Sequence, residues 1–278
     1  MCLINYFKFN KINIKNDENK KLTKEFSYIL FDFLDENNNS QRPFNFDNFK
    51  NVFNNKNAGI FINSSENNIK SLFLLQQMHE ELNEIDENGK LEEFESGQTV
   101  PEIELYKCKT AFESKNKSII SQNYYFSQAK ILKCNKCNKL IYNFMIGNIL
   151  IFDIEKIRIY KERKKEQFNN LNIYDCFDFY TAEEKNGEEN KKFCGICNLE
   201  YNITNKISSF LLPEIFIIYL ERKYNKKFEC TFQIDDKFEV FDKYEFKFNN
   251  MTEHNIPKYE LIGIIVESEE DRGNFLSY

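Results

Sequence analysis

Two cysteine pairs of the form Cys-x-x-Cys constrain this chain more than any other feature. Cys134 pairs with Cys137 and Cys194 pairs with Cys197, and 56 residues separate the two pairs. Thiolates suit zinc because the ion is borderline soft, and a Cys-x-x-Cys turn lets two sulfurs approach one metal without strain. The two pairs therefore predict one tetrahedral Zn²⁺ site with four sulfur ligands. Such a closed site leaves no coordination position for water, so we expect the metal to be structural.

The alternative interpretation of these residues is a pair of redox motifs or a set of unpaired buried thiols, which a single Cys-x-x-Cys would favour more than two do. The N-terminus shows neither a clean apolar core nor the small-residue cleavage site of a secretory signal. We therefore expect reduced thiols in an intracellular protein, cytoplasmic or nuclear. No comparable spacing relates the remaining cysteines, which are Cys2, Cys108, Cys176 and Cys230.

Composition limits the class of protein further. The chain has 278 residues, of which 41% are hydrophobic, enough to bury the core of one large domain or two small ones. Its apolar stretches are shorter than the roughly 20 residues that cross a bilayer, so no membrane partner is expected. A net charge of -6 and a pI near 5.3 argue against a nucleic-acid surface and fit a basic protein partner better.

Apolar periodicity predicts helices in the first part of the chain, over residues 25–35 and 68–85. An acidic stretch, residues 84–95, predicts a solvated segment that connects the elements on either side. From Lys107 onward, short runs of Ile, Phe, Tyr and Leu favour strands over long helices. We expect each cysteine pair at the tip of a hairpin, a short helix over residues 172–184, and buried strands over residues 210–222 and 259–266.

Several motifs occur in the order typical of a known family. Residues 118–137 contain Ser-Ile-Ile, then Tyr-Phe-Ser-Gln, then the first cysteine pair. Residues 174–197 contain Tyr-Asp-Cys-Phe, then Glu-Glu, then the second pair, and residues 212–222 begin with Leu-Pro and end with Leu-Glu-Arg. This order resembles the ubiquitin-specific proteases, cysteine peptidases that remove ubiquitin from proteins. Ser127 stands where that family usually has Gly.

The resemblance implies an α+β, papain-like cysteine peptidase fold with a thumb, a palm and zinc-bearing β fingers. One catalytic-type domain would span residues 1–278: a helical thumb over about 1–106, fingers and the start of the palm over about 107–232, and the rest of the palm over about 233–278. The implied partners are ubiquitin or ubiquitinated proteins, with no nucleic acid and no membrane.

The same resemblance locates the catalytic positions. Cys2-Leu3-Ile4-Asn5 is similar to the box that holds the family's nucleophile, which would be Cys2. Gly273-Asn274-Phe275 lines up with the family's Gly-His-Tyr, so Asn274 stands at the position of the catalytic His, and the sequence ends four residues later, before the third triad position. An amide does not accept a proton near neutral pH. We therefore expect a ubiquitin-binding domain of the deubiquitination system that is inactive or very weak, and solvated or structural roles for His79 and His254.

Two alternatives remain open from the sequence. The chain is an active thiol-dependent deubiquitinase whose catalytic ends are missing from this sequence, or it is a zinc-ribbon interaction module unrelated to ubiquitin. A measurement of ubiquitin affinity distinguishes the zinc-ribbon module, which would not bind ubiquitin, from the other two interpretations.

Overall fold

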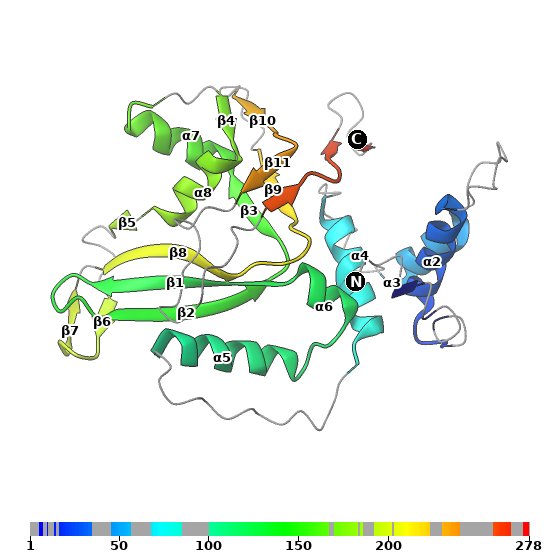
Figure 1. The fold of residues 1–278 in the computed structure, drawn as a ribbon, viewed down its shortest axis with the longest axis horizontal. Helices are drawn as coiled ribbons and strands as arrows, with labels where there is room; N and C mark the ends of the chain where they lie inside the picture. Colours follow the sequence, from blue (N-terminus) through cyan, green and yellow to red (C-terminus); the bar gives the residue numbers. More distant parts are fainter. Residues whose placement is uncertain are drawn as a thin grey trace. The chain divides into compact units, whose positions relative to one another are not determined.

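Helices dominate the first part of the chain and strands the second part (Figure 1). The structure is a computed structural model that describes residues 6, 7, 10, 14, 17–34, 46–56, 68–84, 100–166, 170–182, 184–185, 192–201, 203–222, 230–239, 258–267 and 275–277. The mixture of helices with antiparallel and parallel strands confirms the α+β class. The polypeptide forms two units: residues 1–88, 114–123 and 264–278 make the first, and residues 89–113 and 124–263 make the second.

The first unit contains three longer helices whose ends are joined by one carboxylate. Both oxygens of Glu81 accept hydrogen bonds from the first turn of the earliest helix, from the N–H of Leu22 at 3.1 Å and of Thr23 at 2.7 Å. Glu81 also pairs with Lys56. A carboxylate at a helix N-terminus satisfies N–H groups that lack an intrahelical partner. The elements of this unit are α2 (Lys21–Leu34), α3 (Asp47–Lys56), α4 (Asn68–Leu82), most of α6 (Ile119–Tyr124), and the antiparallel pair β13 (Ile265–Glu267) and β14 (Phe275–Ser277).

A continuous series of aromatic rings packs these helices together. Successive ring centroids lie 5.8 to 6.3 Å apart along the series Phe7, Phe26, Phe49, Phe53 and Phe73. Such contacts add to the stabilisation from apolar burial. The helices predicted over residues 25–35 and 68–85 are confirmed as α2 and α4, whereas α3 was not predicted. The acidic connection over residues 84–95 lies, beyond residue 84, outside the described residues.

The fingers of the second unit are a four-stranded antiparallel sheet in the order β2-β1-β8-β5. Helix α5 lies along β2 in Figure 1, and its Leu105 packs with Ala129 and Ile131 of β1 beside Tyr142 and Phe144 of β2. The strands of the sheet are β1 (Phe126–Cys134), β2 (Leu140–Gly147), β5 (Glu184–Lys185) and β8 (Ile203–Leu211), and α5 spans Val100–Glu113.

The same unit has a second core around two parallel strand pairs. β3 (Leu150–Asp153) pairs with β9 (Ile218–Glu221), and β4 (Asn170–Asn172) pairs with β10 (Thr231–Gln233). The helices beside them both have side-chain caps: Asp153 accepts from the N–H of Lys156 at the start of α7 (Ile154–Arg163), and Asn172 with Asp175 forms a capping box at the start of α8 (Ile173–Thr181). The buried residues of this core include Phe126, Phe152, Ile157, Leu171, Cys176 and Phe177.

The short helix predicted over residues 172–184 is confirmed as α8, but other expectations for this part of the chain need correction. Residues 107–113 are the second half of helix α5, and α7 is a further helix where strands were expected. The strand predicted over residues 210–222 is divided, because Pro213 has no N–H to continue the ladder beyond Leu211.

The strand predicted over residues 259–266 is also divided. It splits into the end of β12 (Lys258–Glu260), which pairs with β11 (Lys237–Glu239), and the start of β13. Between them the N–H of Leu261 donates to the carbonyl of Asp236 at 2.7 Å, and Ile262 is 84% exposed. Among the described residues, no helix is both long and apolar enough to span a membrane.

Candidate metal centre

The two predicted cysteine pairs meet in one cluster of four sulfurs. The Sγ atoms of Cys134, Cys137, Cys194 and Cys197 all lie within 4.8 Å of one another. The Sγ–Sγ distance is 3.9 Å from Cys134 to Cys197 and 3.7 Å from Cys137 to Cys194. A tetrahedron with metal–sulfur bonds of about 2.3 Å has edges of about 3.8 Å. The cluster therefore fits a four-coordinate metal, and the distances are far longer than a disulfide bond of about 2.05 Å.

Each pair lies on a tight hairpin, as predicted. The first hairpin joins β1 to β2, and the second joins β6 (Lys192–Cys194) to β7 (Leu199–Tyr201). Both sit at the same end of the fingers in Figure 1. Because β1 and β6 each end at the first cysteine of their pair, the sheet and the small hairpin together place the four thiols.

An asparagine closes each turn in the same way. The N–H of Asn138 donates to the carbonyl of Cys134 at 2.9 Å, and the N–H of Asn198 donates to that of Cys194 at 2.8 Å. Their φ angles are 59° and 55°, in the left-handed region that asparagine tolerates better than most residues. The sequence reasoning missed these two positions, although the repeated Cys-x-x-Cys-Asn was a visible signal.

Backbone dipoles favour thiolates at the first cysteine of each turn. The N–H groups of Cys137 and Lys136 lower the pKa of Cys134, and those of Cys197 and Ile196 lower the pKa of Cys194 to about 6. Burial has the opposite effect on Cys197 and raises its pKa to about 12. A divalent cation at the centre would favour the thiolate at all four positions.

The predicted catalytic positions, Cys2 and Asn274, lie outside the described residues, as does His254. His79 is described and is buried in the first unit, where its Nδ1 lies 2.7 Å from Ser118 Oγ and its Nε2 lies 3.0 Å from Asn116 Oδ1. Because Ser118 Oγ already accepts from the N–H groups of Ile120 and Ser121, its own hydrogen is available for Nδ1. The expected structural role of His79 is confirmed.

The other described cysteines, Cys108, Cys176 and Cys230, are free thiols. Cys176 is fully buried in the second core, and burial together with the neighbouring Asp175 raises its pKa well above the usual range. Cys108 is partly exposed, and burial also raises its pKa. Cys108 and Cys176 therefore lack the lowered pKa of reactive cysteines.

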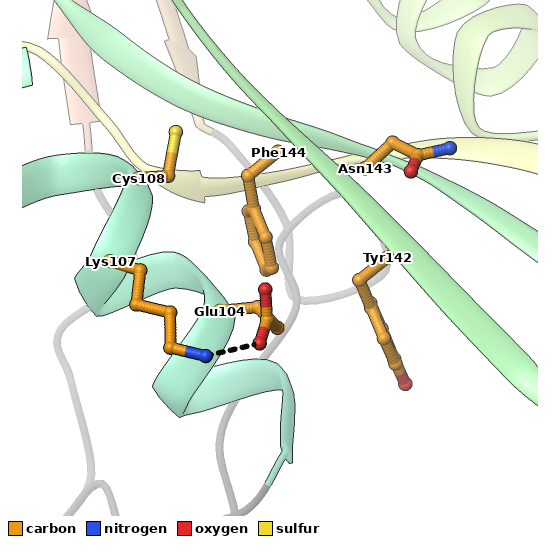
Figure 2. A pocket seen from close by; sticks show the side chains of 6 residues that line it. All are labelled: Glu104, Lys107, Cys108, Tyr142, Asn143 and Phe144. Carbon is orange, nitrogen blue, oxygen red and sulfur yellow. Dashed lines mark hydrogen bonds and ion pairs between the residues drawn. The ribbon is translucent and has the colours of Figure 1, made fainter. Parts of the chain in front are cut away.

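An open depression of about 440 Å³ lies between α5 and β2 (Figure 2). Its α5 side carries Cys108 and an ion pair, in which Lys107 Nζ lies 2.9 Å from Glu104 Oε1. Its β2 side is formed by Tyr142, Asn143 and Phe144. None of the predicted site residues lines this depression, so it is separate from the metal centre.

Comparisons with known proteins cover nearly the whole chain. The family profile "Ubiquitin carboxyl-terminal hydrolase" matches residues 2–278. Proteins named ubiquitin carboxyl-terminal hydrolase 4 are 26% identical to the chain: over 180 residues in Vanderwaltozyma polyspora, which is 63% of this chain and 18% of that protein, and over 157 residues in Saccharomyces cerevisiae, which is 54% and 16%. The chain thus matches less than a fifth of the length of these relatives.

A solved structure shows the same fold. A chain of the SAGA DUB module, which contains Ubp8, Sgf11, Sus1 and Sgf73, superposes with a TM-score of 0.65 at 15% identity, covering 99% of this chain and 54% of that one. The α+β fold is therefore papain-like, with thumb, palm and β fingers, and the four-cysteine cluster lies on the fingers as predicted. The chain belongs to the ubiquitin carboxyl-terminal hydrolase family and is of the ubiquitin-specific protease type.

Proposed function

We propose that this chain is a zinc-stapled ubiquitin-binding domain whose capacity to cleave ubiquitin conjugates is impaired. The observation that carries the zinc assignment is the sulfur geometry, in which four cysteine Sγ atoms have the separations of a tetrahedral centre. Thiolate-only donor sets select zinc among the common divalent ions of the cell, whereas oxygen-rich sets select magnesium and calcium. The metal holds two hairpins together and takes no part in a reaction.

Ubiquitin is the proposed partner because the chain matches the family over nearly its full length. The palm and fingers would receive the globular part of ubiquitin, whose C-terminal tail the chain would also bind. That tail is partly basic, which agrees with the acidic balance of the chain. The full-length match also argues against a zinc module unrelated to ubiquitin. Free cysteines among the described residues fit a reducing compartment, and we propose an intracellular location.

Impaired catalysis follows from the side chain at position 274. Hydrolysis by a cysteine peptidase needs a base that takes the thiol proton and returns it to the leaving amine. We assign the nucleophile position to Cys2 and the base position to Asn274. Because an asparagine amide cannot store that proton, the thiol of Cys2 would remain mostly protonated and acyl transfer would be slow. Loss of one triad member typically lowers the rate by several orders of magnitude.

Calorimetric titration of the zinc-loaded protein with ubiquitin tests the binding proposal. A ubiquitin with an electrophile at its C-terminus tests the reactivity of Cys2, with Cys2→Ala as the variant and Cys108→Ala as the matched control. We expect binding without an adduct. An adduct that disappears only in Cys2→Ala would overturn the impairment, and absence of any binding would overturn the ubiquitin assignment.

The variant Asn274→His examines the missing base directly. If position 274 is the base position, restoring the imidazole raises the rate of adduct formation at Cys2, because a neutral His accepts the thiol proton. The control is Asn274→Gln, which has the same amide chemistry as the native residue. Equal adduct rates in both variants would show that position 274 does not act as the base.

A further inference from the structure

The first metal-binding hairpin has a charge opposite to that of the chain as a whole. Residues 126–147 contain four lysines and no aspartate or glutamate, whereas the whole chain carries a net charge of -6. Lys136 and Lys139 are exposed at the turn, and Lys133 is half-buried beside it. Within the part of the chain that the structure describes, no carboxylate forms an ion pair with Lys133 or Lys139. The first hairpin is therefore basic on a chain that is acidic overall.

Large apolar side chains are exposed at the same end. Phe193 is 59% exposed and Ile196 is 61% exposed on the second hairpin, and Leu140 is 43% exposed on the first. Phe193 directly precedes Cys194, and Ile196 directly precedes Cys197. Leu140 lies opposite Lys133 in the β1–β2 ladder. Exposed apolar side chains that gather at one place commonly mark an interaction surface.

The four-cysteine cluster joins the two hairpins that carry these side chains. The turns that carry Lys136 and Ile196 belong to different hairpins, and the four Sγ atoms between them lie within 4.8 Å of one another. The second hairpin adds one lysine and one glutamate, Lys192 and Glu200, so it does not cancel the charge of the first. We use the name finger tip for the surface formed by Lys133, Lys136, Lys139, Leu140, Phe193 and Ile196.

We propose that the finger tip docks a second protein partner, an acidic segment that carries aliphatic or aromatic side chains. The lysines attract and orient the acidic groups, and Leu140, Phe193 and Ile196 supply the apolar contacts. A partner of this charge is repelled by the rest of the acidic surface, so its approach is directed to this end of the fingers. A nucleic acid would use the lysines but would leave the aliphatic side chains Leu140 and Ile196 in water, so a protein segment fits the surface better.

Fluorescence anisotropy with defined probes tests this proposal on the zinc-loaded full chain at about 0.15 M ionic strength. The first probe is a labelled peptide of alternating Asp, Glu, Leu and Phe. The second is its neutral twin, with Asn and Gln in place of the acidic residues. The third is a single-stranded oligonucleotide with the same number of negative charges as the first. We expect the acidic peptide to bind more tightly than the other two probes, and its affinity to fall as salt is added.

Two finger-tip variants and two matched controls assign the binding to this surface. Lys136→Glu/Lys139→Glu should raise the dissociation constant of the acidic peptide at least tenfold, equivalent to about 1.4 kcal/mol. Lys50→Glu/Lys115→Glu makes the same charge change elsewhere and should have little effect on that constant. Ile196→Ser should weaken binding of the acidic peptide, whereas Ile262→Ser at another exposed position should leave binding unchanged. Zinc content, measured for every variant, must equal that of the native protein for these comparisons to apply.

Three results would overturn the proposal. The first is an acidic peptide that does not bind or that binds no better than its neutral twin, and the second is an oligonucleotide that binds more tightly than the peptide. The third is a finger-tip variant that loses ubiquitin binding together with peptide binding, because the finger tip would then be part of the ubiquitin site. If Lys136→Glu/Lys139→Glu binds ubiquitin as tightly as the native protein does, the finger tip serves a separate partner. If the native protein binds the acidic peptide but not ubiquitin, the ubiquitin-binding function proposed above is refuted and the finger-tip proposal stands.

Discussion

Asn138 and Asn198 occupy equivalent places in two hairpins that share no other sequence beyond their cysteines. Each follows the second cysteine of its pair, each has a φ angle close to 57°, and each donates its N–H to the carbonyl of the first cysteine. The same turn conformation therefore sets the two sulfurs of each pair relative to each other, while the strands place one pair against the other.

A β-branched residue at either asparagine should weaken the metal site. Asn138→Val or Asn198→Val forces a branched side chain into the left-handed region, at a cost of about 1–2 kcal/mol, whereas Asn138→Gly and Asn198→Gly remove the steric conflict. We expect lower zinc affinity in the valine variants only, measured by competition with a chromophoric chelator. Equal affinities of the valine and glycine variants would contradict the role of this conformation.

Loss of one sulfur should release the metal and unfold the fingers. Cys134→Ser or Cys197→Ser removes a ligand, and binding at a site of this kind is coupled to folding. The expected result is loss of stoichiometric zinc, measured by plasma mass spectrometry, together with proteolytic cleavage within residues 126–211. Cys108→Ser serves as the control, because Cys108 lies on α5 away from the cluster. Full zinc retention in either ligand variant would refute the proposal that four sulfurs bind one zinc ion and so hold the two hairpins together.

Two buried serines should respond oppositely to the same substitution. Ser118 Oγ accepts from two backbone N–H groups and contacts His79, whereas Ser127 Oγ is buried and has no hydrogen-bond partner among the residues that the structure describes. Ser118→Ala should therefore lower the free energy of unfolding by about 1–3 kcal/mol. Ser127→Ala should be neutral or stabilising, since it removes an unsatisfied hydroxyl. Urea denaturation measures both, and equal losses would indicate that Ser127 has a partner in solution.

The described thiols should differ sharply in their reaction with maleimide. Near neutral pH, partly exposed Cys108 should react slowly and Cys176 not at all, because burial removes access and raises the pKa of the Cys176 thiol. The metal-centre cysteines should become reactive only after chelation. Peptide mass spectrometry assigns the modified residues. Rapid modification of Cys176 in the folded protein would contradict its position in the core.

The four-cysteine cluster could be predicted from the sequence because its signal is local and chemical. A Cys-x-x-Cys turn brings two sulfurs close together in sequences of many kinds, and a second copy supplies the four ligands of one metal ion. The turn-closing asparagines could have been found by comparing the residues after each pair, since both are Asn. The fold class followed from motif order and not from periodicity.

Helices α5 and α7 could not be predicted because their apolar residues are too few to form a clear stripe. In α5, Leu105 packs against the sheet, and it is the one buried residue among residues 101–113, whose burial the structure describes. The helix is stabilised by the face of β1 and β2, which is tertiary information. In α7, the cap at Asp153 was a signal in the sequence, but the preceding strand residues Leu150–Asp153 obscured it.

The pairing of β1 with β8 has a consequence for synthesis on the ribosome. Cys137 and Cys194 are 57 positions apart, so at about 5–20 residues per second the second turn emerges roughly 3–11 s after the first. During this interval the nascent chain has only two of the four cysteine ligands, and β1 has its neighbour β2 but lacks β8. We therefore expect metal capture to be a late event in biogenesis, which makes the newly made fingers sensitive to oxidants and to zinc scarcity while the mature protein is protected.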